Sequence, residues 1–308
     1  MKAKLEGVVP VIPVPFLEDD SIDEPSLRKA VEFVATRKMK AFCLPAYGSE
    51  FYKLTDAERE QVVRIAIDQA ADRALFVAQA NHPSARVAAE LAQHYEQLGA
   101  HVISVALPRQ FAVTEQDLLA YCAKIAAAVS CPLLIQDFNP GGPTVGAEFI
   151  ATLHRAHANI AYFKLEEPMI MDKLAQVRDS LGEQVGILGG WGGYYMLESM
   201  SVGICGIMPG VPICDLLQRV FDAFQKGDRQ QAYDRFSSLL PYIAFTLQNF
   251  EMFLQIEKRL MVRRGLFRSA RCRALTRTLS HCVSDHIDFL LDQIIAILAR
   301  EQLDYEGD

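Results

Sequence analysis

The sequence has no CxxC pair, although it contains seven cysteines, at positions 43, 122, 131, 205, 214, 272 and 282. Its seven histidines are scattered along the chain and form no cluster of metal-like spacing. Thiols and imidazoles at short, regular spacing hold structural zinc or form redox disulfides, so neither kind of site is predicted. Most of the cysteines lie in apolar runs, where a thiol packs like a small hydrophobic group. We therefore expect reduced cysteines, no metal and no cofactor.

The sequence also lacks an apolar run of about 18 residues, the length that a membrane-spanning helix needs. Its N-terminal stretch, MKAKLEGVVPVIPVPF, contains a glutamate and three prolines where a signal peptide would have an unbroken apolar segment. Positive charge is not in excess, because the formal net charge is −7 at pH 7. This balance argues against general nucleic-acid binding. The absences predict a soluble, cytoplasmic protein that binds neither membranes nor nucleic acid.

One basic segment departs from this balance. Residues 258–277 contain Lys258 and seven arginines, and their leucines and valine recur at near-helical spacing. We expect a helical surface that faces solvent or another subunit, rather than a nucleic-acid site.

Short apolar runs are abundant. Eight of them have the length of a strand, and they lie at residues 7–16, 41–46, 74–80, 101–107, 132–138, 160–166, 185–190 and 203–210. Near-continuous apolarity is typical of strands that are buried on both faces. Segments between them, such as SLRKAVEFVATRK and ARVAAELAQHYEQLGA, have apolar residues at helical spacing. Thr55 and Glu58 predict a capping box at one helix start, and Pro83 suits the first turn of another helix.

The strict alternation of eight strands with helices predicts an α/β fold, a (β/α)8 TIM barrel, over residues 1–211. The pattern then becomes helical only, so residues 212–308 are predicted to form a C-terminal helical bundle packed on the barrel. A doubly wound open sheet is the alternative. It is disfavoured because the loop after the first strand, LEDDSIDE, has no glycine-rich phosphate fingerprint.

A single lysine, Lys164, stands near the end of the sixth apolar run, in the stretch NIAYFKLEEP. A buried ammonium group without a partner is costly, so this lysine either has a partner or is kept neutral for use. The alternative is that it ends the strand and extends to water. In a barrel, the C-terminal ends of the strands form the active site. There Lys164 would meet the loops PAYGSEF, QDFNPGG, GGWGG and MPGVP, and burial would favour a neutral, nucleophilic amine.

These features together resemble the dihydrodipicolinate synthase/N-acetylneuraminate lyase family of class I aldolases and dehydratases. The similarity covers nearly the whole chain, from VPVIPVPF to KRLMVRRG, and includes GSEFYKLTDAER and the Phe163–Lys164 pair. The resemblance implies that Lys164 forms a Schiff base with the carbonyl group of a 2-oxo acid. It also implies a homo-oligomer, a dimer or a tetramer.

Three segments depart from the pattern of family members that act on pyruvate. The Gly-Thr-Thr-Gly-Glu loop is replaced by Ala-Tyr-Gly-Ser-Glu at 46–50, and the Tyr-Asn pair that ends strand 5 is replaced by Gln136 and Asp137. The arginine that binds the second substrate's carboxylate is replaced within GGPTVG, residues 141–146. Glutamine does not titrate and cannot relay protons, so dihydrodipicolinate synthesis is not expected. The motifs resemble more closely the branch of 2-keto-3-deoxy-sugar-acid dehydratases, which includes L-2-keto-3-deoxyarabonate dehydratase.

The predicted site has Lys164 as its catalytic residue. Its predicted substrate-binding residues are Gly48, Ser49, Gln136, Gly190, Trp191 and Met208. Each has a structural alternative, such as a tight turn for the glycines or core packing for the larger side chains. Glu166 and Glu167 are interpreted as solvated loop charges.

The sequence therefore predicts a lyase that dehydrates a small 2-oxo acid, a 2-keto-3-deoxy sugar acid, through an imine on Lys164. A pyruvate-dependent aldolase or a dihydrodipicolinate synthase-like condensation is one alternative. A barrel enzyme that binds phosphate at GGWGG is another. A sugar-acid-binding homologue with impaired catalysis is the third, since the relay tyrosine is missing.

Overall fold

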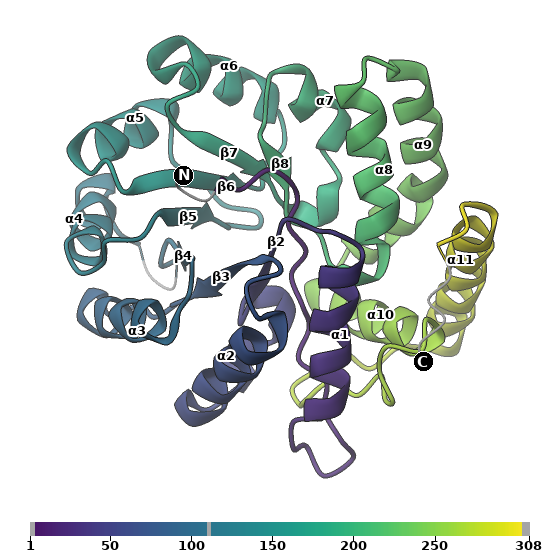
Figure 1. The fold of residues 1–308 in the computed structure, drawn as a ribbon. Helices are drawn as coiled ribbons and strands as arrows, with labels where there is room; N and C mark the ends of the chain where they lie inside the picture. Colours follow the sequence, from purple (N-terminus) through teal and green to yellow (C-terminus); the bar gives the residue numbers. More distant parts are fainter. Residues whose placement is uncertain (1–3, 110–111, 304–308) are drawn as a thin grey trace.

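Eight short strands form the centre of the molecule in the computed structural model, which describes residues 4–109 and 112–303 (Figure 1). They are β1 (Gly7–Val8), β2 (Ala41–Leu44), β3 (Leu75–Gln79), β4 (Val102–Ala106), β5 (Leu133–Asp137), β6 (Ile160–Leu165), β7 (Gly186–Gly189) and β8 (Gly206–Ile207). All neighbours are parallel, in the order β1-β8-β7-β6-β5-β4-β3-β2. A parallel bridge between Val11 and Cys43 brings the segment after β1 against β2. The prediction of a (β/α)8 barrel is confirmed.

Helices alternate with the strands and surround the barrel (Figure 1). They are α1 (Glu24–Thr36), α2 (Asp56–Ala70), α3 (Ala85–Leu98), α4 (Glu115–Ala126), α5 (Ala147–Ala156), α6 (Ile170–Leu181), α7 (Met196–Ser201) and α8 (Cys214–Gln225). The predicted capping box is present at the start of α2, where Thr55 and Glu58 bond each other's backbone N–H groups. Pro83 was predicted to lie in the first turn of a helix, and this is wrong, because α3 begins after its N-cap residue Ser84.

Two apolar layers stabilise the barrel. The inner layer fills its interior with side chains such as Val77, Val102, Leu134, Tyr162 and Leu188. The outer layer lies between the strands and the surrounding helices. Lys164 stands near the C-terminal end of β6, the end of the strands at which barrels of this kind carry their active sites.

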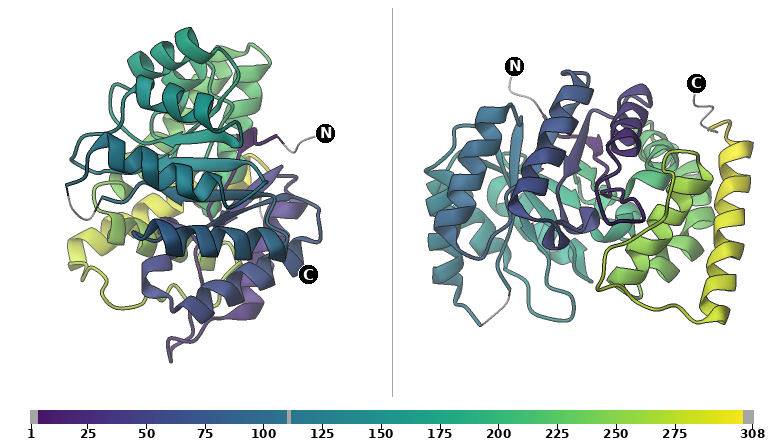
Figure 2. Two further views of the ribbon diagram at one scale, coloured as in Figure 1. Left: turned by 90° about the vertical axis from the view of Figure 1, so that its left-hand side faces the viewer. Right: turned by 90° about the horizontal axis from the view of Figure 1, so that it is seen from below.

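Three further helices extend the chain: α9 (Arg229–Thr246), α10 (Phe250–Arg263) and α11 (His281–Arg300). They lie together on one side of the barrel, with α11 at the outer edge (Figure 2). α8 follows β8 and contacts β1, so it continues the barrel's alternation, and the division at residue 211 stays a prediction. α10 contacts the short 3-10 turn Val211–Ile213 after β8, which brings it to the open end of the barrel.

The basic segment 258–277 was expected to be a helical surface that faces solvent or another subunit. The structure shows that only part of it is helical and that some of its cations are buried. α10 ends at Arg263, and both Lys258 and Arg264 are buried. Lys258 forms an ion pair with Glu50, and Arg264 lies 2.7 Å from the carboxylate of Asp215. Buried charges of this kind need partners, so these two cations hold the helical extension to the barrel.

None of the described helices is long and apolar enough to cross a membrane. All seven cysteines are free thiols. Among residues 4–109 and 112–303, no three histidine, cysteine, aspartate or glutamate side chains come together as a candidate metal site.

Candidate active site

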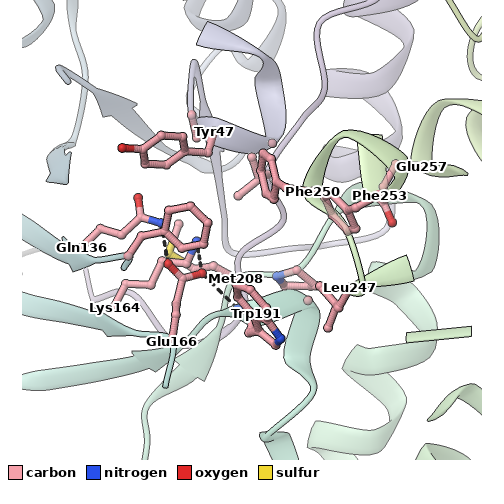
Figure 3. Close-up of a pocket in the computed structure, with 17 residues that line it drawn as sticks. Tyr47, Gln136, Lys164, Glu166, Trp191, Met208, Leu247, Phe250, Phe253 and Glu257 are labelled. Atoms are coloured by element: carbon pink, nitrogen blue, oxygen red, sulfur yellow. Dashed lines mark hydrogen bonds and ion pairs between the residues drawn. The ribbon is translucent and has the colours of Figure 1, made fainter. Parts of the chain in front are cut away.

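A pocket opens at the C-terminal ends of the strands. Figure 3 shows Lys164, Gln136 and Glu166 on one side of it, and Phe253 and Glu257 on the other. Barrel loops and the C-terminal helices both contribute to the wall. Four of the predicted binding residues line the pocket: Gly48, Gln136, Trp191 and Met208.

Lys164 extends from β6 into this pocket. Its backbone partner on β5 is Gln136, so two adjacent parallel strands bring both side chains to the same end of the barrel. The Lys164 side chain is only 9% exposed, and its Nζ lies 3.2 Å from Oε1 of Glu166. A lysine in such a place is shielded from bulk water and has a proton acceptor at hand.

The interpretation of Glu166 and Glu167 as solvated loop charges was wrong: Glu167 is buried and paired with Lys173, and Glu166 lines the pocket. Its side chain is 5% exposed. It accepts hydrogen bonds from Nε2 of Gln136, at 2.6 Å, and from the backbone N–H of Trp191, at 3.0 Å. Alternation continued one residue past the end of β6 at Leu165 would put Glu166 on the same side as Lys164, but the sequence does not show that this residue after the strand is buried.

Gln136 is held in one orientation by a second glutamine. Nε2 of Gln79, on β3, donates to Oε1 of Gln136 at 2.5 Å. The amide group of Gln136 therefore presents its NH2 group to Glu166, which must accept. This chain of three side chains fixes a carboxylate beside Lys164. Gln79 was not predicted, since it lies below the pocket and has no local sequence signal.

Gly190 leaves space for the same carboxylate. A Cβ atom built at this residue would lie 2.1 Å from Oε1 of Glu166, closer than atoms can approach. Gly190 itself is not among the described lining residues, whereas Trp191 and Gly192 are. The structure thus brings Gly190 against Glu166, and its predicted contact with a substrate stays a prediction.

Ser49 lies at the same end of the barrel but behind the pocket wall. It is fully buried, and its hydroxyl group donates to the carbonyl oxygen of Ile12 at 2.6 Å. Tyr47 and Gly48 line the pocket in front of it. The contact of Ser49 joins the loop after β2 to the segment after β1, and its role in substrate binding stays a prediction.

Tyr47 places a phenol group in the pocket. Burial raises the pKa of this phenol, and the nearby carboxylate of Glu166 raises it further, so Tyr47 is neutral at neutral pH. Its ring lies 4.9 Å from the ring of Phe138, which in turn lies 5.9 Å from Trp191 and 5.7 Å from Phe250. These aromatic side chains give the pocket apolar walls.

Helix α10 contributes Phe250, Phe253 and Glu257 to the wall. The active site was predicted within residues 1–211, so these residues were missed. Their spacing of three and four puts them on one face of the helix, but the pattern alone does not reveal what that face contacts. Burial raises the pKa of Glu257 to about 8, although the hydroxyl group of Tyr242 donates to Oε1 at 3.1 Å. Glu257 is therefore mostly a neutral acid at neutral pH.

A buried ion pair joins the same helix to the loop after β2. Glu50 and Lys258 are both fully buried and paired with each other, and Nζ of Lys53 lies 3.0 Å from Glu50. The cation of Lys258 also lies 4.3 Å from the ring centroid of Phe16. The loop that carries Tyr47 and Gly48 is thus anchored on α10.

The site therefore combines a buried amine, a carboxylate with fixed hydrogen bonds, a phenol and apolar walls. Such a set is suited to covalent catalysis at a carbonyl group followed by proton transfer. The carboxylate of Glu166 distinguishes this site from a lysine that only ends a strand, because it can accept a proton from the amine.

The chain is similar to known proteins over most of its length. The sequence model of the dihydrodipicolinate synthetase family matches residues 4–293. L-2-keto-3-deoxyarabonate dehydratase of Azospirillum brasilense is 29% identical over 273 residues, which cover 87% of each chain. 4-Hydroxy-tetrahydrodipicolinate synthase of Methanococcoides burtonii is 29% identical over 77% of this chain and 81% of its own. The crystal structure of dihydrodipicolinate synthase from Rhodopseudomonas palustris superimposes with a TM-score of 0.88, at 24% identity, over 95% of this chain and 99% of that one. At this identity the structural likeness bears on the fold.

Proposed function

The chain belongs to the dihydrodipicolinate synthetase family, whose members are lyases, and we propose that it dehydrates a 2-keto-3-deoxy sugar acid through a Schiff base on Lys164. The observation that carries the proposal is the pair formed by Nζ of Lys164 and Oε1 of Glu166, 3.2 Å apart in a pocket with apolar walls. The 29% identity to L-2-keto-3-deoxyarabonate dehydratase supports this class of substrate.

The first step forms the imine. Glu166 takes a proton from the ammonium group of Lys164, and the freed amine attacks C2 of the 2-oxo acid. The resulting carbinolamine loses its hydroxyl group as water, with the proton supplied by Glu166. The product of this step is an iminium ion between Nζ and C2, and the positive nitrogen acidifies the protons on C3.

The second step removes the C4 hydroxyl group. Glu166, again a carboxylate, accepts a proton from C3 and an enamine forms. The enamine's electron pair expels the hydroxyl group from C4, which leaves as water after it takes a proton from Glu166, or from Tyr47 with Glu166 then returning its proton to the phenolate. Hydrolysis of the conjugated imine returns the amine of Lys164 and releases a 2-oxo acid with one water fewer than the substrate. A positioned acid–base group contributes about 10²–10⁴ to the rate of such a step.

In this proposal, Glu166 and Tyr47 transfer the protons that a tyrosine at the end of strand 5 transfers in other family members. A chain without any proton-transfer group near the lysine would suit a binding protein that has lost catalysis. Here a carboxylate that contacts Lys164, Gln136 and the backbone of Trp191 lies beside the lysine. Retro-aldol cleavage of the C3–C4 bond is the alternative outcome, because it would use the same imine.

Borohydride trapping tests the imine. The protein is incubated with 2-keto-3-deoxy-L-arabonate and sodium borohydride, and its intact mass and peptide masses are measured. We expect one covalent adduct, at Lys164, and none in Lys164→Ala. Normal consumption of the acid by Lys164→Ala, or turnover without an adduct, would contradict the proposal.

Product analysis separates the two outcomes. Dehydration gives a single product that is 18 mass units lighter than the acid, since one molecule of water is lost. Cleavage gives pyruvate and an aldehyde, and lactate dehydrogenase with NADH detects pyruvate directly. Pyruvate in stoichiometric yield would assign the chain as an aldolase.

A further inference from the structure

The far side of the pocket, across from Lys164, has one polar side chain. Leu247, Phe250 and Phe253 give that side its apolar surface, and Glu257 stands among them (Figure 3). Lys164 is the only cationic side chain among the described residues that line the pocket. A substrate attached to Lys164 through C2 would thus extend its tail toward a region with no positive charge.

The carboxyl group of Glu257 has a vacant hydrogen-bonding position. Oε1 accepts from the hydroxyl group of Tyr242 at 3.1 Å, and both residues are buried. Oε2 has no hydrogen-bond partner among the described residues. Buried polar atoms nearly always have a partner, so this oxygen points to a ligand or a water molecule.

A glycine provides the space for this group. A Cβ atom at Gly210, in the loop after β8, would lie 1.7 Å from Oε2 of Glu257, so no larger residue fits there with the carboxyl group in place. Gly210 also lines the pocket. The carboxyl group is therefore seated at the pocket wall by the local backbone and is not a side chain that happens to be nearby.

The protonation state of Glu257 defines what it can bind. Burial raises its pKa to about 8, so it carries a proton at neutral pH. Because Tyr242 already donates to Oε1, the acid proton resides on Oε2, where it is available to an acceptor. The terminal torsion of a glutamate side chain is soft, so a small rotation can turn this O–H group toward a ligand.

We propose that Glu257 binds a hydroxyl group on the tail of the substrate, and that the pocket thereby selects 2-oxo acids whose tail is uncharged and hydroxylated. This inference rests on the proposed function, since the imine at Lys164 holds the other end of the acid. A tail that ends in carboxylate or phosphate would meet Phe250 and Phe253 and a neutral acid, with no cation to pair it. A tail that ends in a methyl group would leave Glu257 unpaired.

Three acids that share the C4 hydroxyl group, with the same configuration at C4, test this selection. They are 4,5-dihydroxy-2-oxopentanoate, 4-hydroxy-2-oxopentanoate and 4-hydroxy-2-oxoglutarate, whose tails end in a hydroxyl group, a methyl group and a carboxylate. We expect kcat/KM of the wild type to be highest for the first acid. In Glu257→Leu it should fall about tenfold or more for the dihydroxy acid and less than threefold for the methyl-ended acid. Glu257→Gln keeps an NH2 donor and should retain the preference.

Gln255→Leu is the matched control, because Gln255 is on the same helix and is not among the described residues that line the pocket. Its preference among the acids should equal that of the wild type. Circular dichroism checks that each variant is folded. An unchanged preference in folded Glu257→Leu, or a wild type that prefers the dicarboxylate, would overturn the inference.

Binding measurements keep this test separate from the proposed function. Affinities of the three acids are measured by calorimetry for Lys164→Ala and for Lys164→Ala/Glu257→Leu, where no imine can form. Lys164→Ala should bind the dihydroxy acid most tightly, and Lys164→Ala/Glu257→Leu should lose this preference. The same preference in both variants, or no binding to either, would contradict the role of Glu257. A wild type that forms no borohydride adduct with pyruvate would instead contradict the imine, whatever the calorimetry gives.

Discussion

Gly190 and Glu166 occupy complementary space: a Cβ atom at residue 190 would lie 2.1 Å from Oε1 of the carboxylate. The carboxylate in turn accepts the backbone N–H of Trp191, so the loop after β7 both makes room for Glu166 and binds it. This contact joins the glycine-rich loop to the carboxylate that lies 3.2 Å from Nζ of Lys164.

Gly190→Ala should therefore displace Glu166. The φ angle at Gly190 is −107°, so alanine meets no left-handed backbone there, and the clash with the carboxylate is the main effect. We expect kcat to fall by about tenfold or more, given that misplacement of a catalytic group by 1 Å can cost about 100-fold. Steady-state kinetics on the dihydroxy acid measures this.

The matched comparison is a double-mutant cycle with Glu166→Ala. If the glycine acts through Glu166, the double variant should be no slower than Glu166→Ala alone. Fully additive losses would mean that Gly190 acts on something else.

Glu166→Gln should separate imine formation from elimination. Glutamine keeps the shape of the side chain but cannot accept a proton from C3, so turnover should fall by about 10²–10⁴. Borohydride should still trap pyruvate on Lys164, because slow imine formation suffices for trapping over hours. Turnover within a few-fold of the wild type would show that another group, Tyr47 being the nearest candidate in the pocket, moves the protons.

The sequence was sufficient to predict the barrel and the position of Lys164 at the end of the barrel where the pocket opens, since both depend on local patterns. Eight apolar runs of strand length, alternating with helical periodicity, specify the fold, and a lysine near the end of such a run is visible directly. The position of Gln136 beside it follows from the register of two neighbouring parallel strands.

Two site residues could not be predicted, for different reasons. Glu166 follows the strand, and whether such a glutamate is solvated or buried depends on the loop after β7, which folds over it through Trp191. Glu257 comes from α10, and a helix that follows a barrel can pack on many faces. Its placement is determined by long-range contacts such as the Glu50–Lys258 pair, which joins residues that are 208 positions apart.

The Glu50–Lys258 pair should be important for stability. Both side chains are fully buried, so Lys258→Met leaves Glu50 with Lys53 as its remaining cation. Removing one partner of a buried pair costs about 3–5 kcal/mol, and the presence of Lys53 should reduce this toward the lower end. Urea denaturation followed by circular dichroism measures the loss, and kcat should fall as well because the loop that carries Tyr47 is loosened.

Arg64→Met is the control for this prediction, because Arg64 and Glu60 form an exposed ion pair with side chains 56% and 39% exposed. Its cost should be below about 1 kcal/mol. The double variant Glu50→Gln/Lys258→Met should recover part of the loss. Equal effects of Lys258→Met and Arg64→Met would show that the buried pair has no special weight.

Glu257 should make stability depend on pH in an unusual direction. Its pKa is about 8 in the folded protein, above the ordinary value of 4.5, so the folded state holds this proton more tightly than the unfolded state does. Stability from this group is complete below pH 4.5 and declines as the pH rises toward 8, by up to about 1.4 kcal/mol per pH unit. Glu257→Gln lacks this titration and keeps an acceptor for Tyr242. We therefore expect the difference in unfolding free energy, Glu257→Gln minus wild type, to grow between pH 5 and 8 and to level off above pH 8. Urea denaturation of both proteins at several pH values measures this difference, and the contributions of the other titrating groups cancel in it. A difference that stays constant between pH 5 and 8 would show that Glu257 is ionised in the folded protein.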